Sequence, residues 1–181
     1  MRGISSVLTT KRKKHQSFRK AWHMLTETIN NELTIAVPDG FEIMSQEDLK
    51  VAYGDVKDKS EKWGMRDRDR HIMITVRWDH HSSMRMKMIN VKATATAQQK
   101  TTARLYAKSD YRLVDTFSRT VAATEAAGYS LTYTVEGITQ AATLMWLKGK
   151  NDVYGISAFS RPEHDQSPAA IDKVLDSIAF V

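Results

Sequence analysis

Histidine side chains are the first candidates for chemistry in this sequence, because imidazole binds transition metals and transfers protons near neutral pH. Three of the six histidines, His71, His80 and His81, flank one predicted strand over residues 72–78. Strand residues at about 3.3 Å each would place His71 far from the other two, beyond the reach of one coordination sphere. We therefore expect no metal site and no bound cofactor.

A nucleophilic site is the second kind of chemistry to consider. His164, Asp165 and Ser167 lie together before the predicted last helix, where turn and capping roles already account for them. The sequence has no cysteine and no Gly-x-Ser-x-Gly motif, and its eight glycines form no phosphate-binding loop. We expect no enzyme activity, with a small hydrolase lacking a recognisable motif as the third alternative.

The strongest charge signal is a basic cluster near the N-terminus, formed by Lys11, Arg12, Lys13, Lys14, Arg19 and Lys20. Residues 1–31 hold seven cations and one acid, which leaves 20 cations and 20 acids in the other residues. The net charge of +6 therefore belongs to this arm. Such a cluster binds phosphates, anionic lipid or an acidic partner, or serves as an exposed, solubilising tail.

Trp63 is the other candidate interaction residue. It lies with Met65 in a charged stretch, residues 55–70, that lacks a periodic pattern and is predicted to be an exposed loop. A loop tryptophan commonly packs on the core. If it stays exposed beside Lys62, Arg66 and Arg68, it is an anchor for a partner protein.

Size and composition favour one domain with an appendage. The chain has 181 residues, 20.6 kDa and 41% hydrophobic residues, enough for one sizeable core. No apolar run is long enough to span a membrane, and the start lacks a secretory signal, so we expect a cytoplasmic protein. We divide it into a basic arm, residues 1–31, and an α+β domain, residues 32–181.

Hydrophobic periodicity gives the expected elements in the N-terminal third. Apolar residues at helical spacing predict an amphipathic helix over residues 17–30. Leu33 to Val37 alternates as a strand, Pro38 to Gly40 turns the chain, and a second strand follows at residues 41–43. A short helix is predicted over residues 46–53, with Ser45 and Asp48 capping it.

The remaining residues predict a mainly antiparallel protein. A long helix is expected over residues 83–109, followed by four strands joined by tight turns. These strands are residues 111–122, 129–135, 138–147 and 152–160. A final helix begins with Ser167 as its N-cap and Pro168 at its first position.

This order of elements resembles the PsbP-like superfamily. The most specific stretches are VPDGFEIMSQEDL, residues 37–49, and DVYGISAFSRPEHDQSPAAIDKVLDSIAF, residues 152–180. The superfamily includes photosystem II lumenal subunits, a Ran-binding nuclear import factor and bacterial proteins. The resemblance implies an α/β/α sandwich, with an antiparallel sheet of about six strands flanked by helices, to which this chain adds an N-terminal helix.

The resemblance also implies an adaptor or assembly role without catalysis. We therefore predict a non-enzymatic protein-interaction domain whose partner is another protein. The alternative is a module that binds nucleic acid or an anionic membrane through the basic arm.

Overall fold

The computed structural model describes residues 25–53, 60–164 and 167–181. A three-stranded sheet has the order β1-β2-β10, and a seven-stranded sheet has the order β3-β4-β5-β9-β8-β7-β6. All strand pairs are antiparallel. The strands are β1 Leu25–Ile29, β2 Leu33–Val37, β3 Glu42–Ile43, β4 Glu61–Asp67, β5 Ile72–His80, β6 Arg112–Val121, β7 Thr124–Val135, β8 Ile138–Lys148, β9 Asp152–Ser160 and β10 Ala179–Phe180. The helices are α1 Gln46–Tyr53, α2 Ser83–Met88, α3 Val91–Leu105 and α4 Ser167–Asp176.

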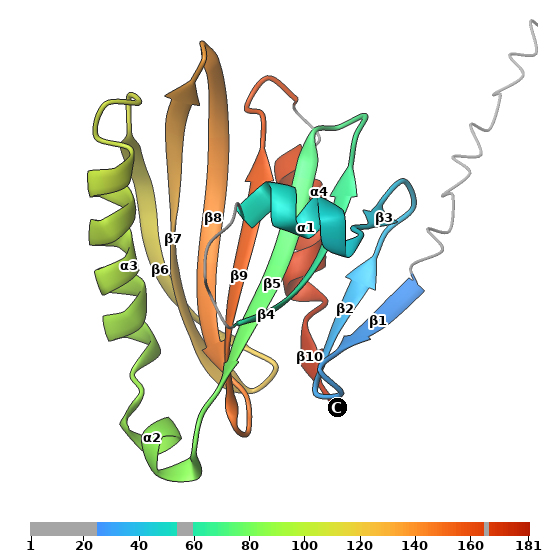
Figure 1. The fold of residues 1–181 in the computed structure, drawn as a ribbon, viewed down its shortest axis with the longest axis vertical. Coiled ribbons are helices and arrows are strands. Elements are labelled where there is room, and N and C mark those ends of the chain that lie inside the picture. Colours follow the sequence, from blue (N-terminus) through green and yellow to red (C-terminus); the bar gives the residue numbers. More distant parts are fainter. Residues whose placement is uncertain (1–24, 54–59, 165–166) are drawn as a thin grey trace, which may run out of the picture.

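The seven-stranded sheet is the central layer, with helices on both faces (Figure 1). On one face, α4 and the three-stranded sheet enclose a large apolar core that includes Ile35, Ile74, Ile156 and Val174. On the other face, α2 and α3 cover a second core built around Tyr129. The predicted α+β class and antiparallel sheet are confirmed, although the central sheet has seven strands where we predicted about six.

Local sequence patterns explain the elements that we predicted best. In β7, Tyr129, Leu131 and Tyr133 alternate with hydroxyl-bearing residues and are at most 9% exposed. The short helix α1 has the predicted bounds, and Ser45 Oγ accepts a hydrogen bond from the Asp48 backbone N–H at 3.1 Å. Asp48 in turn accepts from the Ser45 backbone N–H at 3.1 Å, which completes the capping box.

The predicted helix over residues 17–30 is wrong at its C-terminal end, where residues 25–29 form strand β1. β1 pairs with β2 through the three residues Asn30, Asn31 and Glu32, of which Asn30 and Asn31 both have a φ of 52°. Asparagine tolerates this left-handed backbone, and such turns match the twist of a hairpin. Ile29 is thereby buried in the large core. Residues 17–24 of the predicted helix lie outside the described residues.

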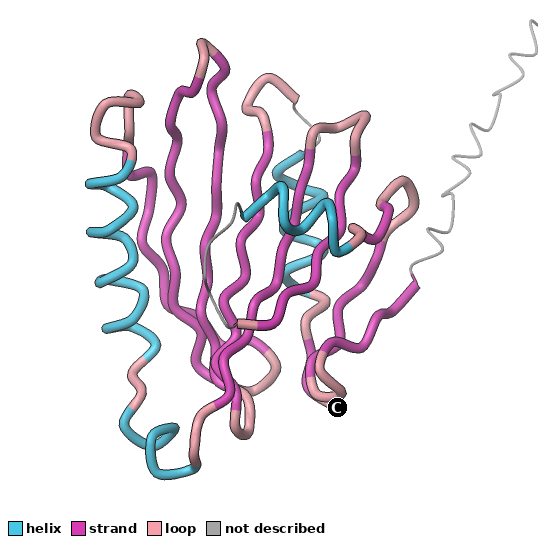
Figure 2. The backbone as a smooth tube through the Cα atoms, in the orientation of Figure 1, coloured by secondary structure: helices cyan, strands magenta, loops and turns pink. Residues whose placement is uncertain are grey.

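The single long helix predicted over residues 83–109 is two helices, α2 and α3, separated at Ile89 and Asn90 (Figure 2). Both residues have extended backbone, and the Asn90 side chain accepts a hydrogen bond from the Ala93 N–H at 3.0 Å. Asn90 is therefore the N-cap of α3, and the chain changes direction between the two helices.

A partly buried polar cluster joins the two sheets. The hydroxyl of Tyr154, on β9, donates to Glu32 Oε2 at 2.8 Å. The Asn30 amide donates to the Tyr154 hydroxyl at 3.1 Å and to Asp152 Oδ2 at 3.2 Å. Burial raises the pKa of Tyr154 well above its ordinary value, which keeps the phenol protonated as a donor. The turn between β1 and β2 is thus held against the central sheet.

Gly128 of β7 provides a test of the packing between the edge strand and its neighbours. A Cβ atom there would lie 2.1 Å from Leu144 O and 2.6 Å from Phe117 Cζ, so the strands would have to move apart. We expect Gly128→Ala to lower the free energy of unfolding by about 3 kcal/mol. Urea denaturation measures this change.

Gly137→Ala is the control, because its Cβ would meet nothing within 4 Å and only its positive φ of 78° opposes the change. We expect a loss of about 1 kcal/mol there. Equal losses in the two variants would contradict the packing around Gly128.

Candidate interaction surface

The basic cluster of the predicted arm, Lys11, Arg12, Lys13, Lys14, Arg19 and Lys20, lies outside the described residues. Its role in binding stays a prediction. We predicted a boundary between arm and domain after residue 31. Residues 25–29 of the predicted arm form strand β1, which pairs with β2 of the domain.

Trp63 lies in strand β4 and not in the exposed loop that we predicted over residues 55–70. Its neighbours Met65 and Asp67 are 0% and 3% exposed, and Trp63 itself is half-buried against the large core. Asp67 can be buried because Arg70 pairs with it at 2.5 Å. The packing of Trp63 on the core is confirmed, and its contact with a partner stays a prediction.

The histidines are spread over several elements. His71 precedes β5 and lies beside His164, with ring centroids 5.0 Å apart. His80, at the other end of β5, has its Nδ1 3.4 Å from Asp152 Oδ1, and His81 follows it. Within the described ranges, no three His, Cys, Asp or Glu side chains form a group that would hold a metal ion.

Ser167 has a structural role that differs from the predicted cap. It lies inside the first turn of α4 with 0% exposure, and its hydroxyl donates to the backbone carbonyl of Arg70 at 3.2 Å. This hydrogen bond fastens the start of α4 to the turn before β5. Because this hydroxyl is buried and donates a hydrogen bond to the backbone, it gives no support to the hydrolase alternative.

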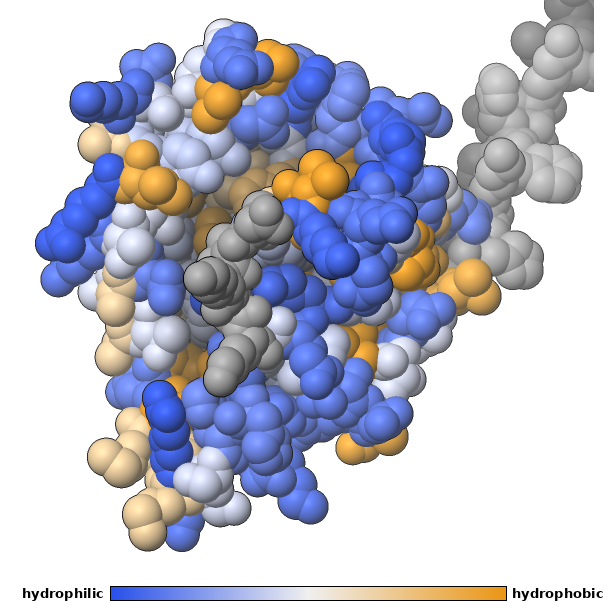
Figure 3. All heavy atoms as spheres, in the orientation of Figure 1, coloured by the Kyte–Doolittle hydropathy of each residue, from blue (hydrophilic) through white to orange (hydrophobic). Residues whose placement is uncertain are grey.

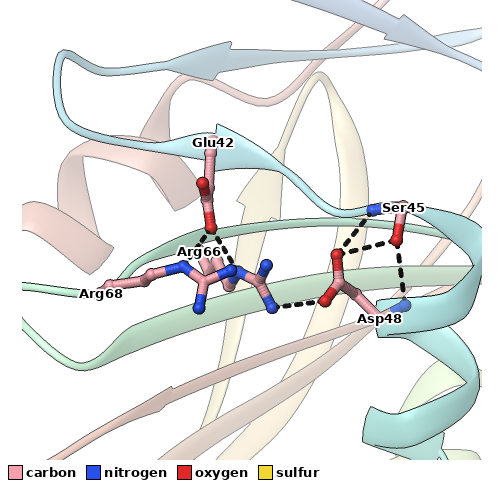
Figure 4. A network of polar contacts seen from close by, with 5 residues as sticks. All are labelled: Glu42, Ser45, Asp48, Arg66 and Arg68. Carbon is pink, nitrogen blue, oxygen red and sulfur yellow. Dashed lines mark hydrogen bonds and ion pairs between the residues drawn. The ribbon is translucent and has the colours of Figure 1, made fainter.

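A network of charged side chains fixes α1 and β3 to β4 (Figure 4). Glu42 accepts from Arg66 Nε at 2.5 Å and from Arg68 Nε at 2.6 Å, while Arg66 Nη1 donates to Asp48 Oδ1 at 2.7 Å. Hydrogen bonds from Arg66 and then Arg68 lower the pKa of Glu42, and those from Ser45 and then Arg66 lower the pKa of Asp48. Both carboxylates are ionised at neutral pH and act as structural ion pairs.

Helices α2 and α3 lie in a stretch of sequence that carries positive charges and no negative ones. Residues 80–109 contain six cations and no acid, and all six are exposed. They are Arg85, Lys87, Lys92, Lys100, Arg104 and Lys108. Residues 32–181 hold equal numbers of cations and acids, and the acids all lie outside residues 80–109. The domain is therefore neutral in total but basic over α2 and α3.

Methionine side chains project from the same surface at α2. Met86 is 5% exposed and anchors the helix to the second core, whereas Met84 and Met88 are 77% and 81% exposed. The two exposed residues are four positions apart and so share one side of the helix. Figure 3 shows apolar side chains protruding at this end of the molecule, next to strongly hydrophilic ones.

A groove of about 520 Å³ lies beside α2, between the connection to α3 and the strands β7 and β8. Met88, Ile89 and Val91 supply its apolar lining, Lys87 and Lys148 supply positive charge, and Glu125 supplies one negative charge. Lys148 Nζ donates to the Ile89 carbonyl at 3.0 Å, which holds the connection in place. The methionines, the cations and this groove together form what we call the α2 surface.

The sequence contained a signal for this surface that we did not use. The stretch SMRMKM, residues 83–88, alternates methionine with cations, and the absence of acids extends over residues 80–109. The expectation of one continuous helix gave no reason for two methionines to face solvent. No helix among the described residues is long and apolar enough to span a membrane, and the cytoplasmic location stays a prediction.

Comparison with known proteins supports the fold. No protein-family model matches the sequence, and comparison with curated proteins finds no relative. The structure is similar to cyanobacterial PsbP (CyanoP) from Synechocystis sp. PCC 6803, with a TM-score of 0.61 and 10% identity over 87% of this chain and 92% of that one. It is also similar to LpqN, involved in cell envelope biogenesis of Mycobacterium tuberculosis, with a TM-score of 0.56 and 11% identity over 88% and 92%.

The protein therefore has the PsbP-like fold, as the resemblance in its sequence predicted. At 10% and 11% identity, these similarities establish the architecture and not a shared activity.

The network of Figure 4 predicts a specific pH dependence. Because the pKa values of Glu42 and Asp48 are lowered from 4.5 and 3.8, their stabilisation is present above these ordinary values and is lost as the pH falls through the lowered ones. We expect Arg66→Met to be less stable than the unaltered protein at neutral pH, by a difference that shrinks in acid. Urea denaturation between about pH 7 and pH 3 measures it.

Arg112→Met, at an exposed position of β6, is the matched control and should show no such convergence. A stability difference for Arg66→Met that stays constant down to about pH 3 would contradict the assignment.

Proposed function

We propose that this protein is a non-enzymatic adaptor domain that binds an acidic segment of a partner protein through its α2 surface. The observation that carries the proposal is the pair Met84 and Met88, 77% and 81% exposed on a helix with no acidic residue. A helix of six residues that uses one methionine as its anchor has no structural need for two more at its surface. Exposed apolar groups that gather beside polar ones are typical of protein contact sites.

The side chains of the α2 surface suit a binding role. Methionine is flexible and polarizable, so it adapts its shape to an apolar side chain of a partner. Burial of Met84 and Met88 would supply affinity, while the neighbouring groove would accept further apolar groups. The proposal needs no reacting group, consistent with the ion-paired state of Glu42 and Asp48 and with the buried hydroxyl of Ser167.

Charge complementarity favours an acidic partner. Six exposed cations lie between residues 80 and 109, and one of them, Lys92, pairs with Glu125 at 3.1 Å. The other five attract a negatively charged segment over distances comparable with the Debye length, about 8 Å at physiological salt. A protein segment is favoured over a nucleic acid because residues 82–105 contain no aromatic side chain on which bases would stack. Tyr106, the first aromatic residue after them, already packs against Tyr133, with ring centroids 4.2 Å apart.

The basic arm supports a second hypothesis, an anionic-surface module acting through residues 11–20. Its charge cluster is the supporting observation. Neutralising Lys11, Arg12, Lys13 and Lys14 tests this hypothesis, because heparin binding should then be lost without loss of stability. The outcome is independent of α2.

The adaptor proposal is tested with peptides selected for binding to the full chain from a random displayed library. We expect the selected peptides to be rich in Asp and Glu around one or two apolar residues. Met84→Ser combined with Met88→Ser should weaken the best peptide by about tenfold or more, measured by fluorescence anisotropy. The stability of the variant should change by about 0.5 kcal/mol or less, because both side chains are exposed.

Val51→Ser on α1 is the matched control, since Val51 is also highly exposed, at 85%, and lies on another element. It should bind the peptide as the unaltered protein does. Peptides without acidic residues, unchanged affinity in the methionine variant, or equally tight binding of duplex DNA that depends on these methionines would refute the proposal.

A further inference from the structure

A small pocket of about 240 Å³ lies between helices α2 and α3 on one side and the central sheet on the other. Met84 and Met88 do not line it. Its floor is a row of three residues on adjacent strands. Arg77 of β5 is paired with Gly155 of β9, and Gly155 is paired with Trp146 of β8. The lack of a side chain at Gly155 lets Arg77 and Trp146 come close to each other over the sheet.

Two nitrogen donors border the same point above Gly155. A Cβ atom built on Gly155 would lie 3.1 Å from Arg77 Nε and 3.2 Å from Trp146 Nε1. Trp146 is 5% exposed, so its indole N–H is largely removed from bulk water while it lines the pocket. Neither side chain makes a hydrogen bond or ion pair with another described residue, and both line the pocket. Two donors that lie side by side over Gly155, without an acceptor among the described residues, are available to an acceptor that enters the pocket.

Other polar side chains line the same pocket. Gln98 of α3 is half-buried and makes no hydrogen bond to another described side chain, so its amide is a further donor. Arg85 of α2 and Asp79 of β5 lie at the exposed rim. Among the Arg, Lys, Asp and Glu side chains of the lining, two arginines and one aspartate leave one net positive charge. Ile89 and Val153 add apolar surface.

We propose that this pocket binds a carboxylate, held by the Arg77 guanidinium and the Trp146 indole N–H. The planar fork of arginine matches the two oxygens of a carboxylate, and charge-assisted hydrogen bonds of this kind are strong. A net charge of one balances a carboxylate, whereas a phosphate dianion would leave an uncompensated negative charge in the pocket. The apolar lining and the small volume suit a compact organic acid. The pocket is independent of Met84 and Met88, so it goes beyond the adaptor role.

The test is a titration of the full chain with sodium benzoate at constant ionic strength and neutral pH, followed by the indole N–H signals in nuclear magnetic resonance spectra. Trp146→Phe identifies the signal of Trp146 among the four tryptophans. We expect a saturable shift of that signal with benzoate and none with benzyl alcohol, its uncharged analogue. Sodium phosphate at the same ionic strength should give a weaker response.

Variants then locate the site. Arg77→Met should weaken benzoate by at least about tenfold. Gly155→Ala should also weaken it, because its Cβ would displace Arg77 and Trp146 without removing charge. Arg112→Met, at an exposed site on β6, should leave the affinity unchanged. The serine variants of Met84 and Met88 should also leave it unchanged, which separates this proposal from the adaptor proposal.

N-acetylglutamate amide distinguishes the source of the carboxylate. Binding comparable with benzoate would indicate an acidic side chain of a protein, and much weaker binding would indicate a free small acid. Absence of a Trp146 shift, an equal response to benzyl alcohol or to phosphate, or full affinity in Arg77→Met would overturn the proposal.

Discussion

Burial of both faces of the seven-stranded sheet is the constraint on which the other parts of the structure depend. An antiparallel sheet can leave one face to water, but here both faces carry large apolar side chains. Ile156 on one face and Tyr129 on the other are each only 1% exposed. The sheet therefore needs two covers, and α4 with the three-stranded sheet supplies one while α2 and α3 supply the other.

The two covers differ in how much of their own surface they bury. Helix α4 places five of its ten residues in buried positions, as expected for a helix that closes a core. Helix α3 buries only Val91 and Ala95 among its fifteen residues. Such small contacts keep the helix attached while most of its side chains stay available to solvent. Helices α2 and α3, which bury few of their own residues, can therefore carry exposed cations and methionines and can border a polar pocket.

The candidate sites show why net charge was an incomplete guide. The domain is neutral by count outside residues 1–31, and we placed the basic character in the arm. Residues 80–109, which form α2, α3 and the turn that follows, carry six exposed cations without an acid between them in sequence, and only Lys92 among them pairs with a described acid, Glu125. Acids such as Glu42 and Asp48 are held at another part of the sheet by Arg66. The cations and acids of the domain cancel in its net charge but lie on different parts of its surface. A binding partner is attracted by the local electric field and not by the net charge.

The sequence by itself determined the features that depend on near neighbours. The alternation in β7 and the capping box of Ser45 and Asp48 are examples, because strand faces and helix caps are set within a few residues. Tertiary structure decided that residues 25–29 form a strand, since β1 gains its hydrogen bonds and the burial of Ile29 only from distant partners. It also brought Arg77 and Trp146 to either side of Gly155. Antiparallel pairing sets such neighbours by register between strands, and no local pattern encodes that register.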